Sequence, residues 1–144
     1  MLIGEYHHTL DAKKRLALPA KFRKELGRKV IITHGFDNCL FVYPQKEWEV
    51  VAAHLAGLSI GQADNRRISR FMLSGAVEAE IDKAGRVLLP DFLKNFSGIK
   101  QKVVVAGVYT RVEIWDEDRW DSHSADTRKQ ADVLAEQLGH VGKL

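Results

Sequence analysis

The chain of 144 residues is poor in features that build covalently linked or membrane-anchored proteins. It contains one cysteine, Cys39, so an internal disulfide is excluded, and we interpret Cys39 as a small buried side chain in a reducing compartment. No apolar run approaches the roughly 18 residues of a membrane helix, which indicates a protein without membrane spans. Residues 1–5 lack a basic stretch followed by a long apolar run, so we expect no secretion signal.

Patterns of catalytic and metal-binding residues are also missing. The sequence has neither a nucleophile elbow nor a glycine-rich loop that would cradle a phosphate. His7 and His8 are adjacent, so on a strand they would point to opposite faces and make a poor joint metal site. We therefore expect no catalytic residue, no metal, no cofactor and no small-molecule substrate, and an enzyme is the least favoured function class.

Positive charge is concentrated near the start of the chain. Residues 1–30 carry eight lysines and arginines against three acidic residues, whereas the net charge of the whole chain is only +3. A basic end on a near-neutral body favours a polyanionic partner. A positive patch is also a common feature of solvated surfaces, so charge alone does not decide the function.

The most informative feature of the sequence is an internal repeat. Leu10–Pro19 and Ile81–Pro90 share Asp, Arg, Leu and Pro at a constant separation of 71 residues. Two later landmarks, an apolar triplet and a tryptophan, also follow each copy. Two copies are too few for a solenoid, which needs about three repeats. The repeat therefore predicts a closed pseudo-twofold body in which each copy covers the apolar face of the other.

Local patterns predict the elements of each copy in the order strand, turn, strand, short helix, strand, strand. Pro19 and Pro90 should occupy the first position of the short helices, which is favourable for proline. Between the copies, apolar spacing predicts a helix from Trp48 that stops at Gly57, followed by a second helix. A last helix, with Ser124 as its N-cap, carries a narrow apolar stripe that either packs on its own core or meets a neighbouring subunit.

These elements give an α+β fold with four parts. We predict a first β-rich module over residues 1–50, a helical connection over 51–75, a second β-rich module over 76–122, and a C-terminal helix or tail over 123–144. The two modules should form a β-barrel-like body with flanking helices.

Each copy contains an Asp-x-x-x-Arg element in the turn between its first two strands. Asp11 and Asp82 are natural turn starters because an Asp carboxylate accepts backbone N–H groups two residues on. Gly85 suits a backbone with positive φ. The arginine that follows each turn can be oriented by the aspartate through a fork-type ion pair. One such turn would mean little, but two, each followed by apolar-x-apolar-Pro, are far more specific.

This duplicated arrangement resembles the MraZ family, whose chains hold two SpoVT–AbrB-type modules, over roughly residues 1–125. The family's Asp-x-Lys-Gly-Arg corresponds to residues 11–15, and its Asp-x-x-Gly-Arg to residues 82–86. The family's Gly-x-Asp-x-Cys-Leu and Glu-x-Trp patterns appear at residues 35–40 and 113–115. The departure is Lys14 in place of glycine. If the first turn copies the second, Lys14 is held at positive φ.

The resemblance implies a cytoplasmic, nucleoid-associated transcriptional regulator. Members of the family bind tandem boxes in double-stranded DNA upstream of their own division and cell wall operon, usually repress it, and assemble as rings of identical subunits. Arginine suits the reading of guanine in the major groove, and lysines suit phosphates. We therefore expect two groups of residues: DNA-binding Lys13, Lys14, Arg15, Lys83 and Arg86, and turn-shaping Asp11, Asp82 and Gly85.

Arg15 is the preferred base-reading residue, with Lys13 and Lys14 on phosphates, because the first turn is the more basic one. Arg86 is the second candidate. Two rival functions remain open: the antitoxin role of other AbrB-type chains, which usually hold one module and a toxin-binding tail, and a structural ring without DNA.

Overall fold

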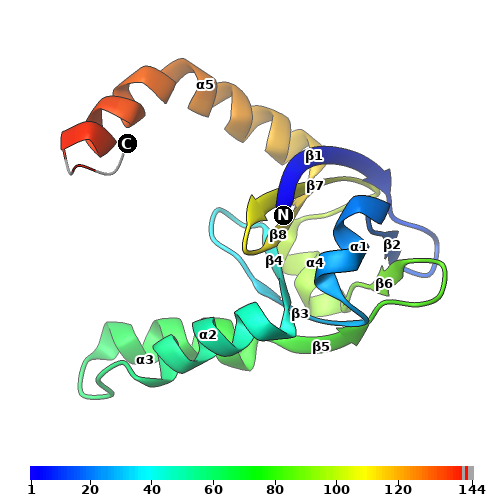
Figure 1. The fold of residues 1–144 in the computed structure, drawn as a ribbon, viewed down its shortest axis with the longest axis horizontal. Helices are drawn as coiled ribbons and strands as arrows, with labels where there is room; N and C mark the ends of the chain where they lie inside the picture. Colours follow the sequence, from blue (N-terminus) through cyan, green and yellow to red (C-terminus); the bar gives the residue numbers. More distant parts are fainter. Residues whose placement is uncertain (141, 143–144) are drawn as a thin grey trace.

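The structure is a computed structural model that describes residues 1–140 and 142. Pairs of strands are separated by helices along the chain, and the second half repeats the order strand, strand, short helix, strand, strand, helix of the first (Figure 1). The elements are β1 (Leu2–Thr9), β2 (Arg15–Ala17), α1 (Ala20–Leu26), β3 (Lys29–His34), β4 (Leu40–Pro44), α2 (Gln45–Ala56), α3 (Ala63–Ser69), the π-helical turn η1 (Arg70–Ser74), β5 (Val77–Glu80), β6 (Arg86–Leu88), α4 (Asp91–Ser97), β7 (Lys102–Tyr109), β8 (Val112–Asp116) and α5 (Glu117–His140).

The strands form two sheets, and every strand pair is antiparallel. Six strands make a sheet in the order β1-β7-β8-β4-β3-β5, and β2 pairs with β6 in a separate two-stranded ribbon. The α+β class is thereby confirmed. The expected barrel is not formed by the described strands, because β1 and β5 remain at opposite edges of an open sheet.

Strand pairing runs between the two copies of the repeat. The first strand of each copy lies against the third strand of the other copy, β1 against β7 and β5 against β3. The second strands pair with each other, and so do the last strands, β4 and β8. Each Asp-led turn therefore joins two strands that have different partners, so neither turn is the end of an extended hairpin.

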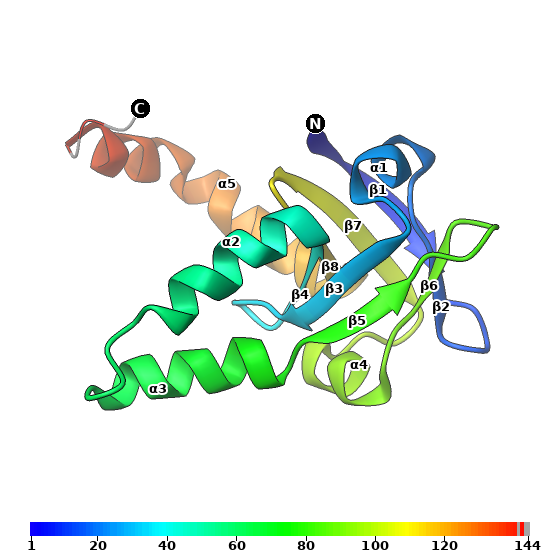
Figure 2. The ribbon, with the colours of Figure 1, turned by 60° about the horizontal axis from the view of Figure 1, so that its bottom comes forward.

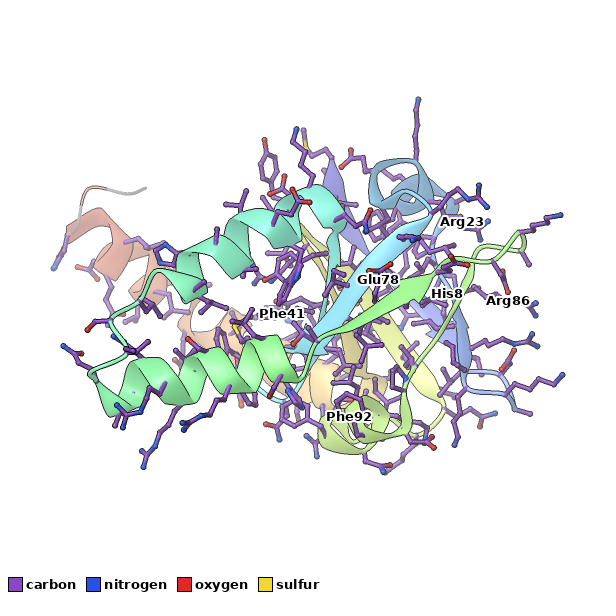
Figure 3. All side chains as sticks on the ribbon, turned by 90° about the horizontal axis from the view of Figure 1, so that it is seen from below. His8, Arg23, Phe41, Glu78, Arg86 and Phe92 are labelled. Carbon is purple, nitrogen blue, oxygen red and sulfur yellow. The ribbon has the colours of Figure 1, made fainter. Side chains whose placement is uncertain are left out.

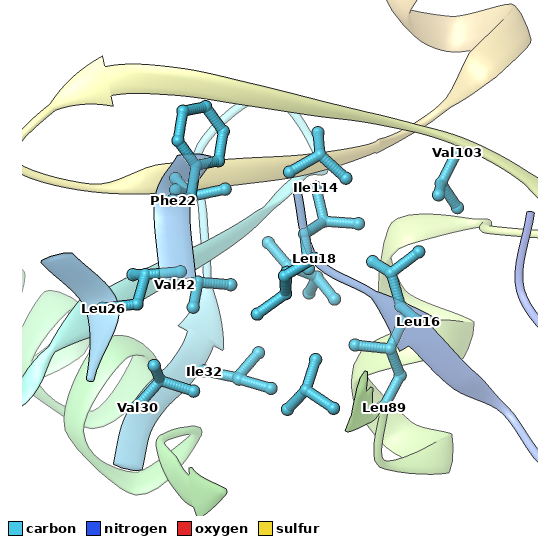
Figure 4. Packing of buried hydrophobic residues seen from close by; sticks show 14 of the residues in the cluster. Leu16, Leu18, Phe22, Leu26, Val30, Ile32, Val42, Leu89, Val103 and Ile114 are labelled. Atoms are coloured by element: carbon cyan, nitrogen blue, oxygen red, sulfur yellow. The ribbon is translucent and has the colours of Figure 1, made fainter. Parts of the chain in front are cut away.

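The main core is built from both copies in equal measure. Leu16, Leu18 and Phe22 of the first copy are essentially inaccessible to solvent, and they share one cluster with Val87 and Leu89 of the second (Figure 4). A second cluster under α2 and η1 contains Cys39, as expected for a buried thiol. Burial raises the pKa of that thiol. Because each copy supplies one wall of the main cluster, neither copy has a complete core of its own.

The short helices begin and end close to the predicted positions. α1 and α4 stop at Gly27 and Gly98, which have φ values of 77° and 65°, conformations that suit glycine after a helix. Pro19 and Pro90 precede the helices instead of occupying the first helical position, because their ψ angles of 134° and 143° are extended. α2 stops at Gly57, as predicted.

The C-terminal helix begins earlier than the sequence suggested. α5 follows β8 without a break, and Glu117 and Asp118 occupy its first turn, where acidic side chains are favourable. Ser124 therefore lies inside the helix, and its assignment as N-cap was wrong. From Asp126 to His140 every residue is exposed. α5 and the α2–α3 pair extend from the side of the body opposite to the β2–β6 ribbon (Figures 1 and 2). No helix in residues 1–140 is both long and apolar enough to cross a membrane.

Candidate nucleic-acid interface

The two Asp-led turns have the same internal hydrogen bonds. The Asp11 carboxylate accepts the backbone N–H groups of Lys13, at 2.8 Å, and Arg15, at 2.9 Å. The Asp82 carboxylate accepts those of Ala84 and Arg86, both at 2.9 Å. Both turns also close through a backbone bond from the fourth residue to the aspartate carbonyl. The repeat in the sequence is therefore a repeat in local geometry.

In each turn the same aspartate also orients the arginine. Nε of Arg15 donates to the second oxygen of Asp11 at 2.9 Å, and Nε of Arg86 donates to Asp82 at 3.0 Å. The backbone N–H bond and the guanidinium of Arg15 hold the pKa of Asp11 below its usual range, and those of Arg86 do the same for Asp82. The aspartates therefore stay ionised at neutral pH and act as fixed acceptors, while each guanidinium keeps further N–H donors.

The left-handed position is the same in both turns. Lys14 has φ 61° and Gly85 has φ 80°. The expectation that Lys14 copies the conformation of Gly85 is thus confirmed. For a residue with a Cβ atom this conformation costs roughly 1–2 kcal/mol. The Lys14 ammonium is also paired with Asp91 at the start of α4. That partner was not anticipated from the sequence, because Asp91 belongs to the other copy.

The ribbon β2–β6 brings the two turns together. Arg15 lies opposite Leu88, and Ala17 lies opposite Arg86. These four side chains share the outer face, because Leu16 and Val87 between them point into the core and are fully buried. Nη1 of Arg86 lies 4.0 Å from the Asp11 carboxylate, so the second arginine reaches the first turn. Leu88, 57% exposed, adds an apolar group beside Arg15.

All five residues predicted to bind DNA therefore lie at one end of the molecule. Lys13 and Lys83 are exposed in the loops that project on the two sides of the ribbon (Figure 2). Arg15 and Arg86 are 31% and 35% exposed on the ribbon itself. Arg23 of α1 joins them and lies near the second turn (Figure 3). Sequence reasoning counted Arg23 only as part of a basic segment. The sequence does contain one signal for Arg23. It follows the core residue Phe22 in α1, so its side chain lies beside the buried face of the helix.

The two histidines lie on opposite sides of β1, as expected. His7 is exposed, and its ring contacts Glu5 and Glu117. His8 is half-buried, and burial, together with the nearby Arg23, holds its pKa below the usual range. Among residues 1–140 and 142, no group of three or more His, Cys, Asp or Glu side chains is placed to hold a metal ion.

Comparison with known proteins assigns the duplicated turns to one family. The family model described as "MraZ protein, putative antitoxin-like" matches residues 1–71 and again residues 72–137. The chain belongs to the MraZ family. The resemblance inferred from the two Asp-x-x-x-Arg elements is confirmed, and each half of the chain matches the MraZ model separately.

Curated MraZ relatives are similar over nearly their full length. The protein named transcriptional regulator MraZ of Moorella thermoacetica is 49% identical, with 96% of each chain covered. Its namesake from Acetivibrio thermocellus is 44% identical, with 99% of each chain covered. A third, from a Thermoanaerobacter species, is 49% identical over 96% of each chain. The match therefore includes the β2–β6 ribbon, both turns and most of α5.

Proposed function

We propose that this chain is a sequence-specific DNA-binding transcriptional regulator. It acts as a ring of identical subunits on tandem promoter boxes and represses its own division and cell wall operon. One observation carries the proposal: two turns of equal geometry, each with an aspartate-oriented arginine, flank a two-stranded ribbon at one end of the molecule. The names of the relatives, transcriptional regulator MraZ, support the same function.

The geometry of the ribbon suits the major groove. A two-stranded β-ribbon can enter that groove, and an arginine fork can bind O6 and N7 of guanine. Asp11 and Asp82 hold Arg15 and Arg86 at the two opposite ends of that ribbon, so little side-chain entropy is lost on binding. Lys13 and Lys83 are exposed in the projecting loops, which supports contacts of these lysines with the phosphates on either side.

The two turns are unequal in charge, and this supports Arg15 as the leading base reader. The first turn contains Lys13 and Lys14, and the second has Ala84 and Gly85 at the matching positions, so that Lys83 is its one lysine. Phosphate contacts supply much of the affinity for DNA. The turn with more lysines should therefore hold its arginine more firmly against the bases.

The ring is supported by the exposed apolar side of α5. Leu134 is 41% exposed and Leu138 is 45% exposed, four residues apart on a helix that extends away from the body. If this stripe packs against a different surface of a neighbouring subunit, the contact is head to tail. Such contacts close into a ring when the rotation between neighbouring subunits is a whole fraction of a full turn. A ring that engages several boxes at once binds more tightly than one subunit could.

The proposal also includes the internal symmetry of the body, the division of the chain into parts and the place where the protein works. The body is pseudo-twofold, its parts are residues 1–50, 51–75, 76–122 and 123–144, and the protein works in the cytoplasm at the nucleoid. The reciprocal pairing of β1 with β7 and β5 with β3 supports the pseudo-twofold relation. The antitoxin alternative is less favoured, because it is typical of chains with one module and a toxin-binding tail.

Electrophoretic shifts with DNA from upstream of its own gene test the proposal. We expect tighter binding to three boxes than to one. We also expect affinity to fall steeply as salt rises, because each phosphate contact adds roughly 0.9 to the magnitude of the slope of log K against log salt concentration. Equal affinity for one and three boxes would contradict the ring on tandem sites. A complete absence of salt-dependent binding would leave the structural ring as the better description.

A further inference from the structure

The second turn contains a glycine where the first contains a lysine, and the space beside that glycine is filled. A Cβ atom added to Gly85 would lie 2.0 Å from Cζ of Arg23 and 2.4 Å from its Nη1. The guanidinium of Arg23 therefore occupies the position where a side chain at residue 85 would begin. Figure 3 shows Arg23, on α1, at the same end of the molecule as Arg86.

Arg23 is fixed in this position by backbone groups of the ribbon. Its Nε donates to the carbonyl oxygen of Leu18 at 2.9 Å, and the N–H of Leu18 donates to the carbonyl of Gly85 at 2.9 Å. None of the ion pairs formed within residues 1–140 and 142 includes Arg23. A guanidinium has five N–H donors, so four are left by this contact.

The surroundings of Arg23 form an open basic groove. A groove of about 750 Å³ lies between the end of α1 and the second turn, and Arg23, Arg28 and Lys83 contribute three positive charges to its lining. Glu80 and Asp82 also line it. Asp82 is engaged by Arg86 at 3.0 Å, so one of the two carboxylates already has a cationic partner.

The first turn reaches the same arrangement in another way. Lys14 has the left-handed backbone of Gly85, and its own side chain leaves from the position that Arg23 fills in the second turn. The residue of α4 that corresponds to Arg23, 71 positions later, is Lys94. Each turn thus has a cation at its left-handed residue: the first from within the turn, the second from a helix of the other copy.

We propose that Arg23 binds a DNA phosphate at the second turn, as the counterpart of Lys14 in the first turn. This inference rests on the proposed DNA-binding function and extends it to a residue outside both Asp-x-x-x-Arg elements. It also gives Gly85 a second role, because a side chain there would displace the Arg23 guanidinium.

The salt dependence of DNA binding tests this contact. Arg23→Gln retains an N–H donor for the Leu18 carbonyl but removes the charge. We expect the slope of log K against log salt to fall in magnitude by about 0.9, the value of one phosphate contact. Arg23→Lys should keep most of the slope. Lys94→Gln, at the matching position of α4, is the control and should leave the slope unchanged.

An exchange of positions makes the test sharper. Gly85→Lys alone should lower the melting temperature, because its Cβ collides with Arg23. In an Arg23→Ala background, which removes the Nε atom 2.2 Å from that Cβ as well as the charge, the added lysine should recover the lost slope, since the second turn then carries its cation as the first turn does. All variants are compared by circular dichroism and thermal melting, so that a folding defect is separated from a lost contact.

Three results would decide the matter. If a folded Arg23→Gln protein has the wild-type slope of log K against log salt, as Lys94→Gln should, the proposed phosphate contact is overturned. The proposed DNA-binding function is not affected by that result. A slope lost in Arg23→Gln and in Arg23→Ala, but not recovered when Gly85→Lys is added to Arg23→Ala, would overturn the equivalence with Lys14. A wild-type protein without salt-dependent binding would instead contradict the proposed function itself.

Discussion

Lys14 combines two opposing effects on stability. Its backbone at φ 61° is costly for a residue with a Cβ, by roughly 1–2 kcal/mol, whereas its solvent-exposed ion pair with Asp91 adds little stability. Lys14→Gly also adds entropy to the unfolded chain, at a cost of about 0.5–1 kcal/mol. We expect a net gain of up to about 1 kcal/mol, seen as a higher melting temperature.

Thermal melts of Lys14→Gly and Asp91→Asn separate the two effects. Asp91→Asn removes the ion pair and also the acidic charge in the first turn of α4, and it should leave the melting temperature unchanged or slightly lower. A melting temperature of Lys14→Gly below that of Asp91→Asn would show that the left-handed backbone costs less than the added chain entropy.

The Lys14–Asp91 ion pair should also weaken DNA binding. On the proposed function, a phosphate competes with the Asp91 carboxylate for the Lys14 ammonium. The pair is solvent-exposed and therefore weak, so Asp91→Asn should bind DNA more tightly by about fivefold at most. Titration at moderate salt measures the change. Asp64→Asn, on α3 at the far end of the molecule, is the control, and an equal gain there would point to overall charge as the cause.

The two arginines should contribute unequally to DNA binding. Arg15→Ala is expected to lose more specific affinity than Arg86→Ala, and a base-reading arginine is worth about 1–3 kcal/mol. Their exposed fractions of 31% and 35% are nearly equal, so accessibility does not explain a difference. The reason is the more basic first turn. Titrating both variants against one operator gives the ranking, and the reverse order would falsify the assignment of Arg15.

Residue spacing predicted the turns but not what surrounds them. The role of Asp11 as an acceptor within its own turn is local, and so is the positive φ of Lys14, and both are visible in five consecutive residues. Asp91 and Arg23 come to the turns from the other copy through the exchanged strand pairing. A single sequence gives no measure of such distant neighbours, because hydrophobic periodicity shows which face is buried and not which strand lies alongside.

At the scale of elements, one histidine joins the edge strand to the last helix. The ring of His7 on β1 contacts Glu117, the first residue of α5, at 3.2 Å, and Glu5 at 3.0 Å. These hydrogen bonds raise the pKa of His7 above its usual value, and the bond with Glu117 has a larger effect than the bond with Glu5. The charged form therefore stabilises the folded state below the unfolded pKa of 6.5, and this contribution is lost as pH rises through the folded pKa.

The wild-type melting temperature should accordingly fall above pH 6.5, and His7→Gln should remove part of that fall. His8 gives a control of opposite sign. Its pKa is lowered by burial, so the folded state resists its protonation and loses stability as pH falls. His8→Gln should flatten the acidic side of the profile and leave the alkaline side unchanged. Equal profiles for wild type and His7→Gln would contradict the joining role of His7.

Helices were easier to predict than strand partners. The apolar spacing from Trp48 to Leu55, with Gly57 after it, located α2 correctly. β2 and β6 have three residues each, which is too short for a periodic pattern to identify a ribbon. The misplaced start of α5 has a similar cause. Glu117 follows the strand directly, so no turn residue separates the two elements, and Asp116, the last strand residue, accepts the N–H of Arg119 in the place predicted for Ser124.

At the scale of the whole molecule, α5 should control assembly. Light scattering at micromolar concentration is expected to show several subunits per particle. Leu134→Glu together with Leu138→Glu should reduce the particle to smaller species, because charge on the apolar stripe cannot be buried cheaply. Glu136→Lys lies on the opposite side of the helix and is the control. A wild-type monomer that binds its operator tightly would contradict the ring.

The pairing of β1 with β7 also has a consequence for synthesis on the ribosome. Leu2 lies beside Tyr109 and Thr9 beside Lys102, so the first strand has no partner until most of the chain has been translated. At about 5–20 residues per second, the nascent first copy waits several seconds with its apolar side uncovered. Synthesis of β7, and not emergence of the first copy, is therefore the event that allows β1 to pair. A ribosome stalled before residue 102 would hold a chain accessible to chaperones and proteases.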